Sequence, residues 1–216
     1  MATHATPHVT HAALLRGIYA IVNEGGADPL AIAGASLRAG VRIVQYRAKG
    51  GVVVDTLRAL RRLTRQHEAF LIVNDDWRAA LAFDCDGVHL GPDDDGFANV
   101  APVRAALGRR LIGLSCGTAD EARAAGTSVD YLGVGCVFPT GSKDDAGAPI
   151  GIEGLLSVAR ATPLPVAAIG GITAQNLSAV RDAGVAMAAV ISAIAGDAEP
   201  AAAAAALVRI WNESAP

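Results

Sequence analysis

The sequence predicts a single-domain α/β protein, a (β/α)8 TIM barrel, on three observations. Short apolar runs recur along all 216 residues, and a segment with helical spacing follows each of them. The composition does not shift between the two halves of the chain. No GxGxxG motif follows the first run, which disfavours an open dinucleotide-binding sheet. Eight even repeats therefore favour a closed barrel, and closure also removes exposed strand edges.

Eight strands are expected, because a short apolar run bounded by turn residues is typical of a buried strand. They cover residues 18–22, 41–45, 70–73, 87–90, 111–114, 131–134, 166–169 and 186–191. The helices that follow them cover residues 30–39, 53–66, 77–83, 99–107, 119–125, 151–160, 173–183 and 201–211. This alternation implies parallel strands joined by crossover helices.

Boundary residues support the helices of the first half. Gly40 suits the C-cap of helix 30–39. Helix 53–66 has apolar residues at helical spacing with charged residues between them, so one face can be buried. Pro102 fits the first turn of helix 99–107, where its missing N–H is not needed.

The helices of the second half have similar signals. Thr118 or Asp120 can cap the fifth helix, and Thr173 can cap the seventh. Between the sixth strand and its helix, residues 135–149 form a long glycine-rich loop that we expect to act as a lid. The alanine run in 201–211 has high helix propensity.

Length and composition fit one compact domain, with 52% hydrophobic residues. We expect residues 1–14 to be a flexible leader and 15–216 to form the barrel. The chain start lacks the features of a secretory signal and no apolar run is long enough to span a membrane, so a cytoplasmic location is expected. A formal net charge of −3 gives no basic face for nucleic acid. Three scattered cysteines indicate free thiols rather than disulfides or a zinc ribbon.

Polar residues gather where the predicted strands end, which is the rim at which barrels bind ligands. They are Gln45, Arg47, Lys49, Asn74, Asp75, Asp76, His89, Asp93, Asp94, Asp95, Ser115, Thr140, Ser142, Lys143 and Ser192. Carboxylates beside cations are expected where a hard metal ion and phosphates lie between them. Mg²⁺ is commonly held by one or two carboxylates plus phosphate oxygens. Asp75 and one of the residues 93–95 would supply those carboxylates.

The segment 166–173 predicts a phosphate site. An apolar strand leads to Gly170 and Gly171, whose lack of Cβ atoms allows close backbone approach. Backbone N–H groups at such a turn can bind an anion. The stretch 190–194 repeats this design about 20 residues later, and loops after the seventh and eighth strands commonly hold phosphate in such barrels.

Each of these features also has a structural explanation. Asp75 could cap helix 77–83, and residues 93–95 could be a solvated turn. His89, inside an apolar strand, fits a packed and hydrogen-bonded histidine better than a base. Lys143 could be an ordinary surface residue. The common position of all these residues at one rim favours the functional interpretation.

Six ordered motifs resemble thiamine phosphate synthase over residues 19–195. They are QYRAK at 45–49, NDD at 74–76, GVHLG at 87–91 with Asp94, GCVFPT at 135–140 with Lys143, IGGI at 169–172 and VISAI at 190–194. The resemblance implies a transferase that joins 4-amino-2-methyl-5-hydroxymethylpyrimidine diphosphate to the phosphate of 4-methyl-5-hydroxyethylthiazole, or to its carboxylated form. The products would be thiamine phosphate and pyrophosphate.

The resemblance also implies roles for individual residues. Residues matching Asp75 and Asp94 bind Mg²⁺. The pyrimidine diphosphate is bound by the counterparts of Gln45, Arg47, Lys49, Asn74, Ser115 and Lys143. The thiazole phosphate is bound by those of Thr140, Ser142, Gly171, Ile191 and Ser192. Catalysis is expected from Arg47, Lys49, Ser115 and Lys143. The expected partners are the two small-molecule substrates, without nucleic acid or membrane, and the sequence does not predict the oligomeric state.

The sequence departs from the family pattern at three places. Gln is common in the family at the position of Pro92, and a small residue followed by His or Asn is common at the positions of Cys116 and Gly117. Thr is frequent at the position of Ser142. These departures leave the charged groups intact. Two other functions remain open: a relative that isomerises the thiazole phosphate, and a non-catalytic protein that binds thiamine phosphate. The presence of Lys49, Asp75, Asp94 and Lys143 favours the synthase.

Overall fold

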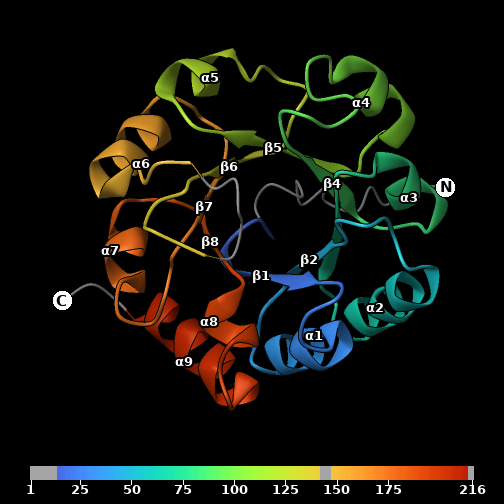
Figure 1. Cartoon of the computed structure of the whole chain (residues 1–216). Coiled ribbons are helices and arrows are strands. Elements are labelled where there is room, and N and C mark those ends of the chain that lie inside the picture. Colours follow the sequence, from blue (N-terminus) through green and yellow to red (C-terminus); the bar gives the residue numbers. More distant parts are fainter. Residues whose placement is uncertain (1–13, 142–146, 214–216) are drawn as a thin grey trace, which may run out of the picture.

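A computed structural model describes residues 14–141 and 147–213. Eight parallel strands close into a barrel in the order β1 to β8 (Figure 1). The strands are β1 (Gly17–Asn23), β2 (Ile43–Arg47), β3 (Phe70–Asn74), β4 (Gly87–Leu90), β5 (Leu111–Cys116), β6 (Tyr131–Val134), β7 (Val166–Ile169) and β8 (Met187–Val190). The predicted barrel and its single domain are therefore confirmed.

Helices surround the barrel in chain order, and the last helix closes the ring beside α1 and α8 (Figure 1). They are α1 (Pro29–Arg38), α2 (Val54–Gln66), α3 (Trp77–Ala82), α4 (Ala101–Leu107), α5 (Ala119–Ala124), α6 (Gly151–Arg160), α7 (Leu177–Asp182), α8 (Ser192–Ala195) and α9 (Pro200–Asn212). In the described residues, none of these helices is long and apolar enough to cross a membrane.

Several details differ from the sequence prediction. Strand β2 lies two residues later than predicted, at Ile43–Arg47 rather than 41–45, and α4 begins at Ala101 rather than at residue 99. The seventh helix begins at Leu177 rather than Thr173, because residues 173–176 form a turn. The fifth strand extends through Ser115, so this side chain projects from the strand itself. The short helix α8 was not predicted, since four residues give no periodicity to detect. Thr118 does cap α5, accepting from the backbone N–H of Glu121.

Apolar side chains form two cores, one on each side of the barrel wall. The outer core packs the helices against the strands, and Leu57 and Leu60 of α2 belong to it. The inner core fills the barrel with side chains such as Ile43, Ile72 and Met187. Because the strands are buried on both faces, their sequences read as continuous apolar runs rather than alternating ones.

The amino ends of the strands are tied by half-buried ion pairs. Asp86, just before β4, accepts from Arg61 of α2 at 2.6 Å and from the N–H of Leu71 at 2.7 Å. Asp130, just before β6, accepts from Arg104 and from the N–H of Ile112. These contacts fasten neighbouring strands at the end of the barrel opposite the predicted ligand rim, where stability rather than chemistry is expected.

Candidate active site

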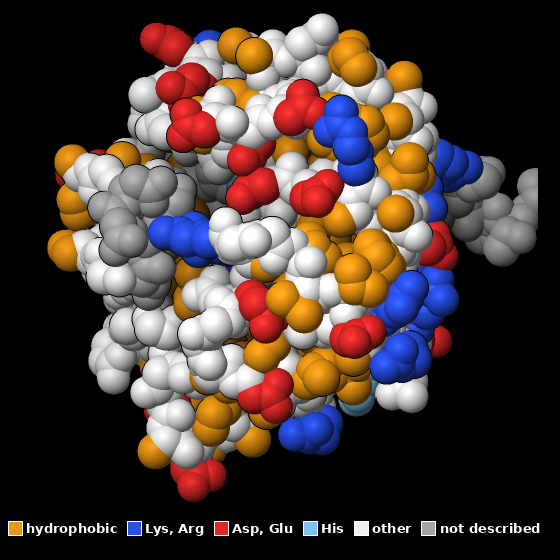
Figure 2. Space-filling model, turned by 45° about the vertical axis from the view of Figure 1, so that its right-hand side comes forward, with side chains coloured by type: hydrophobic (Ala, Val, Ile, Leu, Met, Phe, Trp, Pro, Cys, Tyr) orange, Lys and Arg blue, Asp and Glu red, His pale blue; other side chains and the backbone are white. Residues whose placement is uncertain are grey.

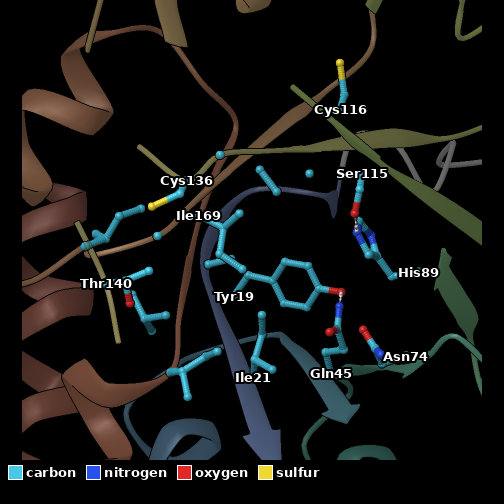
Figure 3. A pocket seen from close by; sticks show the side chains of 18 of the residues that line it. Tyr19, Ile21, Gln45, Asn74, His89, Ser115, Cys116, Cys136, Thr140 and Ile169 are labelled. Atoms are coloured by element: carbon cyan, nitrogen blue, oxygen red, sulfur yellow. Dashed lines mark hydrogen bonds between the residues drawn. The ribbon is translucent and has the colours of Figure 1, made fainter. Parts of the chain in front are cut away.

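A pocket of about 520 Å³ opens at the carboxyl ends of the strands. Every strand, or the loop that follows it, contributes to the lining (Figure 3). The polar lining residues Gln45, Arg47, Asn74, His89 and Ser115 come from β2 to β5. The lining from the loop after β6 and from the ends of β7 and β8 is rich in glycine and aliphatic residues. The pocket therefore offers two chemically different regions under one mouth.

Most of the predicted site residues line this pocket. They are Gln45, Arg47, Asn74, Ser115, Thr140, Gly171, Ile191 and Ser192. Lys49, Asp75 and Asp94 belong to loops around the mouth and are not among the lining residues. Ser142 and Lys143 lie outside the described residues. Figure 2 shows a face on which several acidic side chains lie close together beside single basic ones.

Five polar side chains in the pocket form one hydrogen-bonded chain. The Gln45 Nε2 donates to Tyr19 Oη at 2.8 Å, and Tyr19 Oη lies 2.9 Å from Tyr131 Oη. Tyr131 Oη lies 3.2 Å from His89 Nδ1, and His89 Nε2 lies 3.2 Å from Ser115 Oγ. Figure 3 shows the two ends of this chain, at Gln45 and Ser115. The chain links β1, β2, β4, β5 and β6 across the barrel.

Burial controls the protonation of the two tyrosines in this chain. Both are almost completely buried, and desolvation of the phenolate raises the pKa of Tyr19 and of Tyr131 well above the ordinary value. Both hydroxyls therefore keep their protons at neutral pH and can each donate one hydrogen bond. His89 is hydrogen-bonded within the barrel, as the sequence indicated, but it also faces the pocket.

The acidic residues of the mouth lie on two adjacent loops. Asp75 follows β3, and its N–H donates to the carbonyl of His89 in β4 at 2.8 Å. Asp94 lies in the loop after β4 and accepts from the N–H of Gly91 at 2.6 Å. A Cβ on Gly91 would lie 3.3 Å from Asp94 Oδ2 and 3.8 Å from Ser115 Oγ, so this carboxylate lies close to the polar region of the pocket.

Helix capping does not explain Asp75. The side chain of Asp76 accepts from the N–H of Ala79 and caps α3. Asp75 itself has φ of +68°, a left-handed backbone that is uncommon outside glycine. The structural alternative for residues 93–95 fits Asp93 and Asp95, which are both exposed in turns, and Asp95 also accepts from Arg78 and Trp77. The hydrogen bond from Arg78 is the main cause that lowers the pKa of Asp95.

Two carboxylates could hold a divalent ion here. Within residues 14–141 and 147–213, no group of three or more His, Cys, Asp or Glu side chains could form a complete metal cage. A Mg²⁺ ion bound by two carboxylates takes its remaining ligands from phosphate oxygens and water. Asp75 and Asp94 supply hard oxygen donors of the right number for such a site.

The glycines after β7 are required by the protein backbone itself. Gly170 and Gly171 have φ of +104° and +62°. A Cβ on Gly170 would lie 2.7 Å from the Cα of Cys136, and one on Gly171 would lie 2.5 Å from the carbonyl oxygen of Pro139. The loop after β6 packs against them, with Phe138 N–H donating to Gly170 at 3.0 Å. The two loops thus form one wall of the pocket.

Thr173 does not cap a helix, contrary to the prediction. The side chain of Asn176 accepts from the N–H of Thr173 at 2.8 Å and donates to the carbonyl of Gly171 at 2.9 Å. Asn176 therefore closes the turn after the glycines and fixes its shape. An Asn side chain commonly stabilises such a turn, which was the signal available in the sequence.

Sequence reasoning missed two further groups of pocket residues. Tyr19 and Tyr131 were read only as members of apolar strands. Glu121 of α5 lines the pocket and accepts from the N–H of Gly117 at 2.7 Å. Their signal was weak, because a tyrosine in a strand or a glutamate in a helix is common without function.

The unusual residues Pro92, Cys116 and Gly117 also line the pocket. Burial raises the pKa of the Cys116 thiol and of the Cys136 thiol. Neither sulfur is therefore a thiolate nucleophile at neutral pH. The three cysteines are free, as predicted.

A family model described as thiamine monophosphate synthase matches residues 18–194. Thiamine-phosphate synthase of Moorella thermoacetica is 45% identical over 186 residues, which are 83% of this chain and 87% of that protein. Thiamine-phosphate synthase of Archaeoglobus fulgidus is 44% identical over 193 residues, covering 87% and 89% of the two chains.

The fold comparison agrees with the sequence comparison. Thiamine phosphate pyrophosphorylase from Pyrococcus furiosus superposes with a TM-score of 0.82 and is 34% identical. The match covers 91% of this chain and 96% of that one. The pocket described above lies within the matched region.

Proposed function

Since this chain belongs to the thiamine monophosphate synthase family, we propose that it joins the two halves of thiamine. The reaction is that of a thiamine-phosphate synthase: a 4-aminopyrimidine carrying a methyl diphosphate reacts with a thiazole phosphate, and thiamine phosphate and pyrophosphate are formed. The observation that carries the proposal is the division of one pocket into a polar region and a glycine-walled region. Two ligands of different chemistry can meet there.

The polar region would bind the pyrimidine diphosphate. Gln45 and Ser115 offer hydrogen-bonding groups for the edge of the ring, and Asn74 adds an amide beside them. Arg47 is half-buried at the end of β2 and faces the same pocket, where a guanidinium can bind phosphate with two parallel hydrogen bonds. Lys49 and Lys143 would add further positive charge, as the family resemblance implies.

Asp75 and Asp94 would hold Mg²⁺ at the mouth beside the diphosphate. The ion supplies neutralisation of the charge on the leaving group when it is bound. The left-handed backbone of Asp75 and its N–H bond to His89 fix the start of the loop that presents this carboxylate. Strained residues of this kind cluster at functional sites, and the capping role belongs to Asp76.

The glycine-walled region would bind the thiazole phosphate. Gly171, Ile191 and Ser192 line this region, and Thr140 faces it from the loop after β6. The turn held by Asn176 fixes the backbone that follows Gly171. Phosphate binding by loops after the seventh and eighth strands is frequent in this barrel fold. Ser142, outside the described residues, is assigned to the same phosphate by resemblance alone.

The chemistry needs charge stabilisation and not a protein nucleophile. The 4-amino group of the pyrimidine can donate electrons toward its exocyclic CH₂, so the C–O bond to diphosphate breaks first. The thiazole nitrogen then forms the new C–N bond with the resulting cation. Arg47, Lys49 and Lys143 would stabilise the departing diphosphate, and the closely packed pocket would hold the two reacting atoms together.

Pyrophosphate release tests this function. The assay supplies both substrates, and omits each substrate or Mg²⁺ in turn. Release that requires all three supports the synthase. An isomerase would convert the thiazole phosphate without releasing pyrophosphate, and a binding protein would release none. A cytoplasmic location stays a prediction that this assay does not address.

A further inference from the structure

Two glycines make room in the barrel for the hydrogen-bonded chain from Gln45 to Ser115. Gly113 of β5 and Gly133 of β6 lie beside it. A Cβ on Gly113 would lie 2.6 Å from His89 Nδ1, and one on Gly133 would lie 2.7 Å from His89 Cε1. Glycine weakens a strand interior, and it is found where another group approaches closely. The absence of side chains at Gly113 and Gly133 therefore leaves the space that His89 and Tyr131 occupy.

With Gln45 Nε2 as the donor to Tyr19, only one direction of donation along this hydrogen-bonded chain gives the hydroxyl protons of both tyrosines an acceptor. The amide nitrogen of Gln45 can only donate, so Tyr19 Oη accepts from it. Tyr19 then donates its own proton to Tyr131, the second partner of its hydroxyl. Tyr131 in turn donates to His89 Nδ1.

The second half of the chain follows from the tautomer of His89. With Nδ1 as an acceptor, a neutral imidazole carries its proton on Nε2 and donates it to Ser115 Oγ. The hydroxyl proton of Ser115 is then available to the pocket. At the other end, Gln45 has its amide oxygen left for a ligand. The hydrogen-bonded chain thus presents to the pocket an acceptor at Gln45 and a donor at Ser115.

We propose that Tyr19, Tyr131 and His89 are positioning residues that select a 4-aminopyrimidine over its 4-oxo counterpart. Gln45 Oε1 would accept from the amino group, and Ser115 would donate to a ring nitrogen. Replacing the amino group by oxygen would place two acceptors against each other. This inference rests on the proposed function and adds to it the basis of pyrimidine selection.

The test compares the binding of two product molecules that do not react. Thiamine phosphate and its 4-oxo analogue are titrated into wild-type protein and into Tyr131→Phe, with affinities measured by calorimetry. In the variant, the Tyr19 hydroxyl loses its acceptor at Tyr131. The Gln45 side-chain amide then rotates by about 180°, so that its oxygen accepts from Tyr19 and its NH₂ group faces the ligand. We expect the preference for the amino compound to fall by about tenfold, the effect of one mismatched buried hydrogen bond.

Tyr46→Phe is the matched control. The Tyr46 hydroxyl is also hydrogen-bonded, to Glu24 at 2.6 Å and to the N–H of Val53 at 3.2 Å, but it does not belong to the chain. Its loss can weaken both ligands equally and should leave their affinity ratio unchanged. The inference is overturned if the ratio of the two affinities is unchanged in folded Tyr131→Phe, or if this ratio falls equally in Tyr46→Phe. In either case, pyrophosphate release by the wild type would still uphold the proposed function.

A second measurement is made on the wild-type protein itself. NMR of wild-type protein labelled with ¹⁵N-histidine reports the tautomer of each ring, and the His89 signal is identified by its loss in His89→Gln. With thiamine phosphate bound, we expect neutral His89 with its proton on Nε2. A proton on Nδ1 would reverse the direction of the chain and overturn the inference. Absence of pyrophosphate release by the wild type would instead overturn the proposed function itself.

Discussion

The backbone N–H of Asp75 donates to the carbonyl oxygen of His89 at 2.8 Å, so the loop after β3 starts against the end of β4. Asp94 lies on the loop that follows β4. The two carboxylates therefore come from adjacent loops whose starting points are joined. This arrangement supports the proposal that Asp75 and Asp94 hold Mg²⁺, which the family resemblance implies.

Asp75→Asn should raise the Mg²⁺ concentration needed for half-maximal pyrophosphate release. Asn tolerates the left-handed backbone at φ of +68° and keeps the shape of the side chain, but it removes the negative charge. The melting temperature should stay close to that of the wild type. A normal Mg²⁺ response in this variant would contradict the assigned role.

Asp76→Ala is the control for that experiment. Asp76 caps α3 through the N–H of Ala79, and loss of such a cap costs about 1 kcal/mol of the free energy of unfolding. Chemical denaturation should show this loss, whereas the Mg²⁺ dependence should not change. The opposite result, with Asp76 controlling the metal response, would exchange the roles of the two residues.

Lys143→Ala should lower kcat by about 10²–10³, the usual effect of removing one charged group that stabilises a transition state. Lys143→Arg keeps the charge and should recover part of the loss. Single-turnover kinetics would show the defect in the step that releases diphosphate. Equal turnover in Lys143→Ala and wild type would remove Lys143 from the mechanism.

Gly171→Ala should weaken binding of the thiazole phosphate by more than the strain of a left-handed alanine accounts for. Its Cβ would lie 2.5 Å from the carbonyl oxygen of Pro139, at φ of +62°. Gly184 has φ of +79° with nothing within 4 Å of a Cβ, so Gly184→Ala measures the strain by itself. We expect a higher KM for the thiazole phosphate in Gly171→Ala only. Similar values in both variants would show that contact with Pro139 is unimportant.

Alkaline pH should reduce the contribution of Tyr46 to stability. Burial, with a further effect of Glu24, raises the pKa of Tyr46 from 10.0 to about 12. The folded state thus favours the neutral phenol, so this stability is complete below pH 10 and is lost as the pH rises toward 12. The melting temperatures of wild type and Tyr46→Phe are compared at about pH 9 and at about pH 11. The wild type should exceed the variant by less at the higher pH. A constant difference would contradict this pKa shift.

The barrel could be predicted because each of its strands is a continuous apolar run followed by an amphipathic helix. The positions of Gln45, Asn74 and Ser115 at one rim followed from the fold, since parallel strands in a barrel share their carboxyl ends. These predictions depended on periodicity, which is a local property of the chain.

The hydrogen-bonded chain could not be predicted, because it depends on contacts between residues far apart in the sequence. Tyr19 and Tyr131 are 112 positions apart, and only closure of the barrel brings their hydroxyls together. The capping error at Thr173 has a different origin. Thr173 and Asn176 are both suitable turn residues, and the choice between them depends on how Gly171 is packed.

A crystal structure with Mg²⁺ and pyrophosphate tests the central claim most directly. We predict the metal ion bound by the carboxylates of Asp75 and Asp94, with the pyrophosphate beside Arg47 at the polar side of the pocket. A metal ion bound elsewhere, with both carboxylates directed into solvent, would contradict the account.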